Sequence, residues 1–419
     1  MNSLNDADHP TTDEIKKHRM AQAEVSVLKP DHSPLAQQEV VIAQTNHQFL
    51  FGTTGYPILY ALGDLGGAEK EQADRRVDKL THLFNYVTLP FYWGRFEPQQ
   101  GHPMTEPLMK AARWCADHQL VLKGHPLCWH TVTADWLMSM SNAEILQTQI
   151  ARIQREVSNF RGLVDCWDVI NEAVIMPIFD KYDNGITRIC KELGRIETIR
   201  TMFDAARAAN PAAILLLNDF DISPAYDILV EGCLEAGIKI DVIGIQSHMH
   251  QGYWGVEKTL QVLEQFSRFN LPIHFTETNL VSGHLMPPEI VDLNDYQVEH
   301  WPTTPDGEER QAREAVTHFK TLLADPLVGG ITWWDFTDGG WLNAPAGLIR
   351  KDGSTKPAYE ELLRLIKGEW WLAPTRFGTD NDGRVDFGGF LGEYELTYDG
   401  KRYPFTLDST GTSAVEIHL

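Results

Sequence analysis

Two glutamates lie in apolar segments that are far apart in the chain. Glu172 belongs to the segment CWDVINEA, and Glu277 belongs to IHFTETN. A charged side chain that ends a buried apolar segment is costly unless it has a partner or a function. One such residue is more often structural, but two of them indicate paired chemistry. Facing carboxyl groups can deliver a proton and capture a cationic sugar carbon, which is what cleavage of a glycosidic bond requires.

Eight short apolar segments provide the elements that would position these carboxylates. They are rich in β-branched residues with little polar alternation, which is typical of strands buried on both faces. Helical patterns fill most of the gaps, for example at residues 69–84, 142–160 and 255–269. Alternating strands and helices predict βαβ units, and eight of them favour an α/β fold of the closed (β/α)8 TIM-barrel type. The predicted strands are residues 49–54, 87–91, 121–129, 164–172, 214–220, 242–248, 273–278 and 330–336.

Polar residues gather where these predicted strands end. Barrel active sites are built at the carboxyl ends of the strands, so we expect these side chains to meet at one mouth. The chain has no G-x-G-x-x-G turn and no P-loop, so nucleotide chemistry has no support. The residues are His125, Asn171, Glu172, Asn218, Asp219, Gln246, His248 and Glu277.

Both ends of the chain differ from this pattern and predict a small antiparallel β unit. Residues 24–46 hold two strand-like runs, and the Asp-Gly pairs at 382–383 and 399–400 are typical of hairpins. We expect a polar tail at 1–20, disordered or weakly helical, and an N-terminal β segment at 21–47. The barrel would span 48–368, and a C-terminal β segment at 369–419 would pack with the N-terminal one. Trp370 and Trp371 favour core packing at this junction, with carbohydrate binding as the alternative.

The composition limits the partners. The 419 residues carry a formal net charge of -22, which disfavours nucleic acid and membranes but suits a neutral carbohydrate. The first 20 residues lack the apolar core of a signal peptide, so the sequence as written predicts a cytoplasmic protein, or a secreted one if such a peptide was removed. The five cysteines show no CxxC spacing, which indicates neither a disulfide framework nor a zinc site. Cys128 and Cys166 are expected to be buried, inert thiols. The oligomeric state is left open.

Taken together, the motifs of the chain resemble those of glycoside hydrolase family 10, the group of retaining β-1,4-xylanases. The motifs follow the family order over residues 48–367. The NE and TE segments alone would indicate only the broader clan of retaining barrel enzymes, so the ordered set is what is specific. The segments that carry the resemblance are KGHPLCWH, WDVINEA, LLLNDF, IGIQSHMH, FTETN, GITWWDFTDGGW and KPAY.

The resemblance implies a role for each residue. Glu172 would protonate the leaving oxygen and then activate water, and Glu277 would attack the anomeric carbon about 5–5.5 Å from the first carboxyl group. Glu172 would have a raised pKa, and Glu277 would be ionised by its hydrogen bonds. No cofactor and no metal are implied. Substrate-binding residues would be His125, Trp129, Asn171, Gln246, His248, Trp334, Trp341 and Tyr92, with Asn218, Asp219 and Asn279 behind them.

Three positions depart from the family pattern. Tyr92 of TLPFYWGRFEP stands where the family carries the Lys of E-N-x-x-K-W, and the Glu-Asn pair is absent. A phenol cannot replace an ammonium donor, so the subsite for the next sugar out is expected to be remodelled. Asn279 replaces an Asp two residues after Glu277, which changes the proton state that His248 prefers. Trp341 lies one residue nearer Asp338 than usual.

Two features admit more than one interpretation. His248 and His250, or His125 and His130, could suggest a metal site, but no third ligand has suitable spacing, so hydroxyl-binding histidines are favoured. The Pro-rich and acidic insertion at 281–308 is either a solvated loop or a cover for the site.

The leading functional prediction is hydrolysis of β-1,4-xylosidic bonds in xylan or xylo-oligosaccharides with retention. A retaining β-glycosidase of other specificity is the first alternative. A catalytically inactive carbohydrate-binding protein is the second, and the presence of both Glu172 and Glu277 argues against it.

Overall fold

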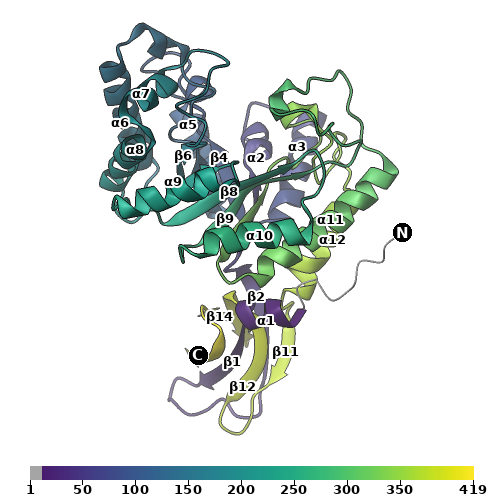
Figure 1. Ribbon diagram of the computed structural model, residues 1–419. Helices are drawn as coiled ribbons and strands as arrows, with labels where there is room; N and C mark the ends of the chain where they lie inside the picture. Colours follow the sequence, from purple (N-terminus) through teal and green to yellow (C-terminus); the bar gives the residue numbers. More distant parts are fainter. Residues whose placement is uncertain (1–11) are drawn as a thin grey trace.

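The computed structural model describes residues 12–419, and its centre is a closed barrel of parallel strands (Figure 1). The strands follow one another around the barrel in chain order, and the last of them closes it against the first. This arrangement confirms the predicted TIM barrel. The strands are β3 (Leu50–Thr54), β4 (Tyr86–Pro90), β5 (Val121–His125), β6 (Cys166–Asn171), β7 (Ile214–Asp219), β8 (Val242–Met249), β9 (Ile273–Leu280) and β10 (Val328–Trp333).

Helices surround the barrel and bury their apolar faces against it. Helix α6 illustrates why they form: Ser141 and Glu144 make a capping box at its start, and Ile145, Ile153 and Val157 recur along its buried face. The helices of the barrel region are α2 (Tyr56–Ala61), α3 (Gly67–Leu83), α4 (Trp93–Phe96), α5 (Thr105–Asp117), α6 (Asn142–Asn159), α7 (Gly185–Leu193), α8 (Arg195–Ala209), α9 (Pro224–Glu235), α10 (Gly255–Ser267), α11 (Pro305–Ala324) and α12 (Pro357–Arg364). None of the helices within residues 12–419 combines the length and apolar character needed to cross a lipid bilayer.

The strand ends differ from the predicted ones by a few residues. The third strand was expected to run to residue 129, but β5 ends at His125. The next residue is Pro126, which has no N–H to continue a ladder. Leu127 and Cys128 instead donate their backbone N–H groups to carbonyls of β6 across a short loop. That loop carries Trp129 over the mouth of the barrel.

The two chain ends form two small sheets that pack face to face. The first has the order β12-β1-β15 and the second β11-β2-β13-β14. Most pairings are antiparallel as predicted, but β1 and β15 run parallel. Alternate side chains of β1 are buried between the sheets, which share one apolar core. The strands are β1 (Met20–Leu28), β2 (Glu39–His47), β11 (Thr375–Gly378), β12 (Arg384–Phe390), β13 (Gly392–Tyr398), β14 (Lys401–Leu407) and β15 (Gly411–His418).

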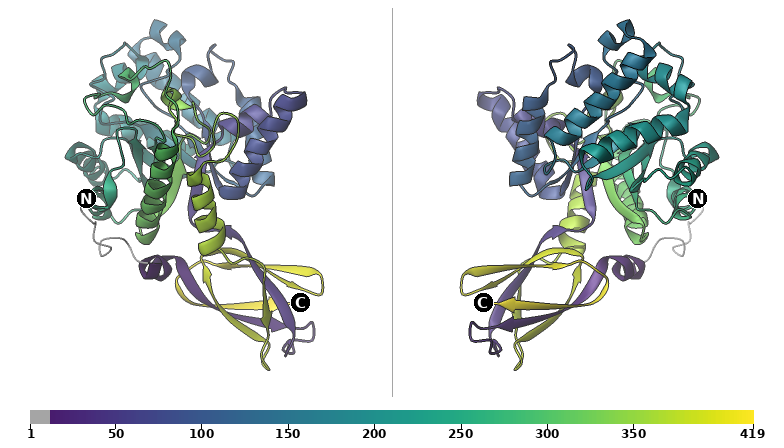
Figure 2. Two further views of the ribbon diagram at one scale, coloured as in Figure 1. Left: turned by 90° about the vertical axis from the view of Figure 1, so that its right-hand side faces the viewer. Right: turned by 90° about the vertical axis from the view of Figure 1, so that its left-hand side faces the viewer.

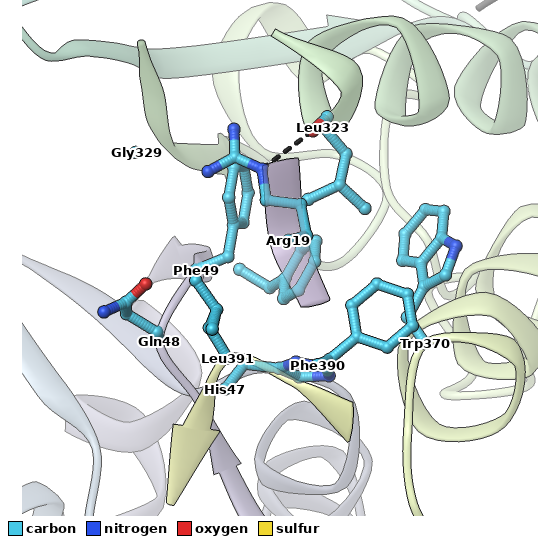
Figure 3. Close-up of a pocket in the computed structure, with 10 residues that line it drawn as sticks. Arg19, His47, Gln48, Phe49, Leu323, Gly329, Trp370, Phe390 and Leu391 are labelled. Atoms are coloured by element: carbon cyan, nitrogen blue, oxygen red, sulfur yellow. Dashed lines mark hydrogen bonds between the residues drawn. The ribbon is translucent and has the colours of Figure 1, made fainter. Parts of the chain in front are cut away.

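This β unit lies at the end of the barrel where the strands begin (Figure 2). A cavity of about 200 Å³ at the junction is lined by residues of the barrel, among them the start of β3 and β10, and by residues of the terminal segments, among them Arg19, Phe390 and Leu391 (Figure 3). Trp370 is 1% exposed there, which supports the packing role over carbohydrate binding. Trp371 packs on His47 and under the Lys367 ammonium.

The sequence assigned residues 12–19 to a polar tail that is either disordered or weakly helical, and the structure has the helical alternative. These residues form helix α1 (Thr12–Arg19), which buries Ile15, and residues 1–11 lie outside the described part. Arg19 donates from Nε to the Leu323 carbonyl at the end of α11 (2.8 Å) and from Nη2 to the Val328 carbonyl at the start of β10 (2.7 Å). This anchor holds the terminal unit against the barrel.

Candidate active site

A cleft of about 1330 Å³ opens at the carboxyl ends of the barrel strands, opposite the β unit. Its volume exceeds the roughly 300–1,000 Å³ of common small-molecule sites, so it has room for an oligomer. Both predicted catalytic glutamates and all eight predicted substrate-binding residues line it. Asn218, Asp219 and Asn279 lie fully buried behind that lining. The structure therefore brings the whole predicted set to one place.

Glu172 follows the last residue of β6 in an unusual backbone conformation. Its φ of 60° lies in the left-handed region, which non-glycine residues rarely adopt without a compensating structure. The Glu172 N–H donates to the Asn218 carbonyl (2.7 Å), which fixes this turn. Trp129 Nε1 donates to the Glu172 carboxyl group (2.8 Å), as do the amides of Asn171 (3.2 Å) and Gln246 (3.3 Å). Burial outweighs these hydrogen bonds and raises the pKa of Glu172 to about 8.

Two buried amides connect the glutamates. Asn218 Nδ2 donates both to Asn171 Oδ1 (2.7 Å) and to Glu277 Oε1 (3.0 Å). Thr276 Oγ1 donates to Asn218 Oδ1 (2.5 Å), so the amide group cannot be turned around. Gly244 lies against this amide, and a Cβ there would be 2.5 Å from Asn218 Oδ1. Only glycine therefore lets Asn218 bridge the two sides of the site.

Glu277 lies between two imidazole rings. His248 Nε2 is 3.0 Å from its Oε2 atom, and His125 Nε2 is 3.8 Å from its Oε1 atom. Burial alone would raise the pKa of Glu277, but the charge of His125 and the hydrogen bond and charge of His248 outweigh it and lower that pKa. The two glutamates thus favour opposite protonation states, as acid and nucleophile require.

Two charged residues that support His125 were missed in the sequence. Asp168 Oδ2 accepts from His125 Nδ1 (2.7 Å) and forms an ion pair with the fully buried Lys123 ammonium (2.6 Å). Burial would raise the pKa of Asp168, but the Lys123 charge and the His125 hydrogen bond lower it. Both residues stand inside apolar strands, and a charge in such a strand was the signal that could have revealed them.

A second series of contacts lies behind His248. His248 Nδ1 is 2.6 Å from Asn279 Oδ1, and Asn279 Nδ2 donates to Asp335 Oδ2 (3.2 Å). The Trp341 N–H donates to the other Asp335 oxygen (3.2 Å). Burial raises the pKa of Asp335 to about 6. Asn279 stands where the family has an Asp. The Asp335 carboxyl group therefore acts on His248 through the Asn279 amide and not by direct contact.

Asp219 has a different neighbourhood from the one around His248. Its carboxylate accepts from the backbone N–H groups of Val174 (3.0 Å) and Asp221 (3.0 Å). It therefore fixes the loop that follows Glu172. Burial raises the pKa of Asp219 to about 7.

Aromatic rings form the walls of the cleft. Trp334 meets the His125 ring edge-on at 5.2 Å, and Trp341 lies 4.6 Å from the His248 ring. Tyr92 lies 5.4 Å from His125 and 5.6 Å from Trp129, measured between ring centroids. Flat apolar faces of this kind suit sugar rings, which present C–H groups.

The insertion at 281–308 lies over the cleft instead of extending freely into solvent. It has a small core of its own around Met286 and Trp301, and residues 291–294, 297 and 298 line the cleft. The Lys181 ammonium reaches it from the loop after β6 and contacts the Asp295 carboxylate (2.7 Å). The covering role is therefore the one that the structure supports.

The remaining histidines and cysteines of the described part of the chain show no arrangement for metal or thiol chemistry. Within residues 12–419, no three His, Cys, Asp or Glu side chains are grouped so that they could hold a metal ion. Burial lowers the pKa of His130 to about 4 and that of His250 to about 3. Burial also raises the pKa of Cys166 to about 12, so this thiol stays protonated.

Comparisons with known proteins agree with this geometry. The sequence profile of glycosyl hydrolase family 10 matches residues 64–365. Endo-1,4-beta-xylanase B of Thermotoga neapolitana is 28% identical over 316 residues, covering 70% of this chain and 84% of that protein. Endo-1,4-beta-xylanase C of Paenibacillus barcinonensis is 25% identical over 82% of this chain, which spans only 36% of that protein. The crystal structure of xylanase 10B from Thermotoga maritima has a similar fold, with a TM-score of 0.61 and 24% identity over 77% of this chain and 96% of that one.

Proposed function

Because this chain belongs to glycosyl hydrolase family 10 and is a glycoside hydrolase, we propose that it cleaves β-1,4-xylosidic bonds with retention of configuration. The observation that carries the proposal is the pair of linked glutamates with opposite protonation preferences in one cleft. An amide bridge through Asn171 and Asn218 joins them. This link supports the separation of about 5–5.5 Å that a retaining pair needs.

In the first step, the Glu277 carboxylate attacks the anomeric carbon while Glu172 protonates the leaving oxygen. The lowered pKa of Glu277 and the pKa of about 8 of Glu172 support these starting states near neutral pH. The sugar becomes an ester of Glu277, and the aglycone leaves as an alcohol with the proton from Glu172.

In the second step, Glu172 takes a proton from a water molecule, which attacks the same anomeric carbon. The negative charge of Glu277 contributes to the raised pKa of Glu172. That charge is absent in the ester, so the pKa of Glu172 falls when Glu172 must act as a base. Hydrolysis of the ester returns both carboxyl groups to their starting states.

The choice of xylose rests on the family and on the names of the relatives, which are endo-1,4-beta-xylanases. His125, Asn171 and the tryptophans around the glutamates would hold the sugar at the cleaved bond. Tyr92 replaces the expected Lys, so recognition of the next sugar out differs from the common family pattern.

The test is product analysis on xylohexaose by NMR, together with rates on aryl β-xylosides and aryl β-glucosides. We expect the β-anomer to appear first from xylohexaose, and xylosides to react faster than glucosides. Glu172→Gln and Glu277→Gln should each lower kcat by orders of magnitude. An α-anomeric first product would overturn retention, and cleavage of glucosides alone would favour the β-glycosidase of other specificity.

A further inference from the structure

Arg95 presents a guanidinium group to the cleft from the short helix that follows β4. It is exposed, lines the cleft and belongs to no ion pair within residues 12–419. It donates to the Tyr56 hydroxyl, and its guanidinium carbon lies 5.7 Å from the centroid of the Tyr92 ring. The group is therefore held in place by two phenols and keeps donors for a ligand.

A second arginine lies at the same end of the cleft. Arg76 Nη2 donates to the Lys351 carbonyl (2.6 Å), while its buried Nε atom has no partner. Arg76 lines the cleft with Tyr56 and Tyr60 and likewise forms no ion pair in the described part of the chain. In a protein with a net charge of -22, two arginines without carboxylate partners in one cleft need an explanation.

The acidic residues of the cleft do not supply that explanation, because each has other partners. Asp335 accepts from Asn279 and from the Trp341 N–H, and Asp338 is held by the Lys356 ammonium and the Gly347 N–H. The cation at the insertion, Lys181, is paired with two aspartates. Among the described residues that line the cleft, only those at the end with Arg76 and Arg95 include lysine or arginine side chains without a carboxylate partner.

The position of Tyr92 relates these arginines to the substrate. Its ring contacts His125 and Trp129, which in the proposed function would surround the sugar at the cleaved bond, so the next sugar outward would lie against Tyr92. A substituent on that sugar would reach Arg95. Arginine binds carboxylates with two parallel hydrogen bonds, which lysine and neutral residues cannot reproduce.

We propose that this end of the cleft is a carboxylate-binding subsite and that the enzyme favours xylo-oligosaccharides bearing a uronate on the glycone side. This inference rests on the proposed function and adds the substrate class to it. The carboxylate could belong to a uronic acid branch on a xylose or to a uronic acid at the non-reducing end of the chain.

The experiment measures kcat/KM on three probes: xylotetraose, a xylotetraose with a glucuronic acid branch on its non-reducing half, and a xylo-oligosaccharide ending in a uronic acid. The proteins are the wild type, Arg95→Gln, Arg95→Lys and Arg113→Gln. Arg113 is an exposed arginine of α5 outside the cleft and is the matched control. Each acidic rate is divided by the rate on xylotetraose for the same protein.

We expect the wild-type ratio to exceed one for at least one acidic probe, and the identity of that probe distinguishes the branch from the chain end. Arg95→Gln should lower the ratio by about tenfold to a hundredfold, the range for a charge-assisted hydrogen bond. The ratio for Arg95→Lys should lie between those of the wild type and Arg95→Gln, and the ratio for Arg113→Gln should match that of the wild type. High salt should reduce the wild-type preference.

A wild-type ratio at or below one that Arg95→Gln leaves unchanged would overturn the subsite while leaving xylan hydrolysis intact. Failure to cleave any of the three probes would instead overturn the proposed function, and the subsite with it.

Discussion

Asp335 should control the ionisation of Glu277, the proposed nucleophile, although it does not touch it. Its Oδ2 atom accepts from Asn279 Nδ2, and it can do so whether or not a proton sits on Oδ1; this bond turns Asn279 Oδ1 toward His248 Nδ1. His248 must then donate from Nδ1, and it can also donate from Nε2 to Glu277 only as an imidazolium. In Asp335→Asn the Asn279 amide is free to rotate, and His248 can hold a single proton on Nε2.

The expected effect on activity follows from the loss of that positive charge. An opposite charge within about 4–6 Å lowers the pKa of a carboxyl group by about 1–3 units, and His248 lies 3.0 Å from Glu277. The acidic limb of kcat/KM should therefore move up by about one unit or more. The variant would lose activity mainly on the acidic side of the profile, with a much smaller loss near pH 7.

The stability of Asp335→Asn relative to wild type should also depend on pH, and it should be higher at alkaline pH than at acidic pH. Burial raises the pKa of Asp335 from 3.8 to about 6. A carboxyl group whose pKa is higher in the folded than in the unfolded protein stabilises the fold fully at pH values below its unfolded-state pKa. This stabilisation is lost as the pH rises through its folded-state pKa. At about 1.36 kcal/mol per pKa unit, the free energy of unfolding of Asp335→Asn relative to wild type should increase by about 3 kcal/mol between pH 4 and pH 8.

The assay is a pair of pH series, one of kcat/KM and one of urea unfolding. Asp219→Asn is the control, because Asp219 is also buried with a raised pKa but contributes to the pKa of Glu172. The Asp219→Asn variant should move the alkaline limb of kcat/KM to lower pH and leave the acidic limb at the same pH. If Asp335→Asn left the acidic limb where it is in wild type, His248 would not be held as an imidazolium through Asn279, and the argument would fail.

Three further predictions concern other parts of the site. The alkaline limb of kcat/KM should lie near pH 8, because Glu172 must be protonated in the first step and its pKa is about 8; a limb near pH 5 would contradict this. Gly244→Ala should reduce kcat at least tenfold by displacing Asn218, whereas Gly378→Ala, which has no atom within 4 Å of the new Cβ, should not. Lys181→Met should change the free energy of unfolding by less than about 1 kcal/mol, because the ion pairs of Lys181 are half-exposed. The same variant should raise the rate on polymeric xylan relative to xylotetraose by releasing the insertion, and an unchanged ratio would mean that the insertion does not limit access.

The barrel and its polar mouth could be predicted because both depend on local patterns. Apolar runs that end in His125, Asn171 or Glu277 mark strand ends, and parallel strand ends must converge. The chain ends were harder to predict, since the parallel pairing of β1 with β15 joins residues almost 400 positions apart. The tail that holds helix α1 was left as either disordered or weakly helical, because a single apolar residue, Ile15, anchors the helix.

Contacts between distant side chains could not be predicted. The role of Asp335 depends on Asn279, which lies 56 residues away and is recognisable only as a departure from the family pattern. The left-handed turn at Glu172 has no local cause and is fixed by the neighbouring strand through the Asn218 carbonyl. The donors left free on Arg95 become evident only when every acid in the cleft has a known partner.

The buried acids and the free arginines together explain how an acidic protein could accept an acidic substrate. Glu172, Asp219 and Asp335 have pKa values raised by burial to about 8, 7 and 6, so near pH 6 much of their negative charge is neutralised by protons. Glu277 is kept ionised, but the histidines on either side offset its charge. The cleft is therefore far less negative at that pH than the chain as a whole, and the Arg95 guanidinium meets little competition for an incoming carboxylate. As the pH rises from 6 to above 8 the three acids ionise in turn, and the same cleft repels the substrate that Arg95 attracts.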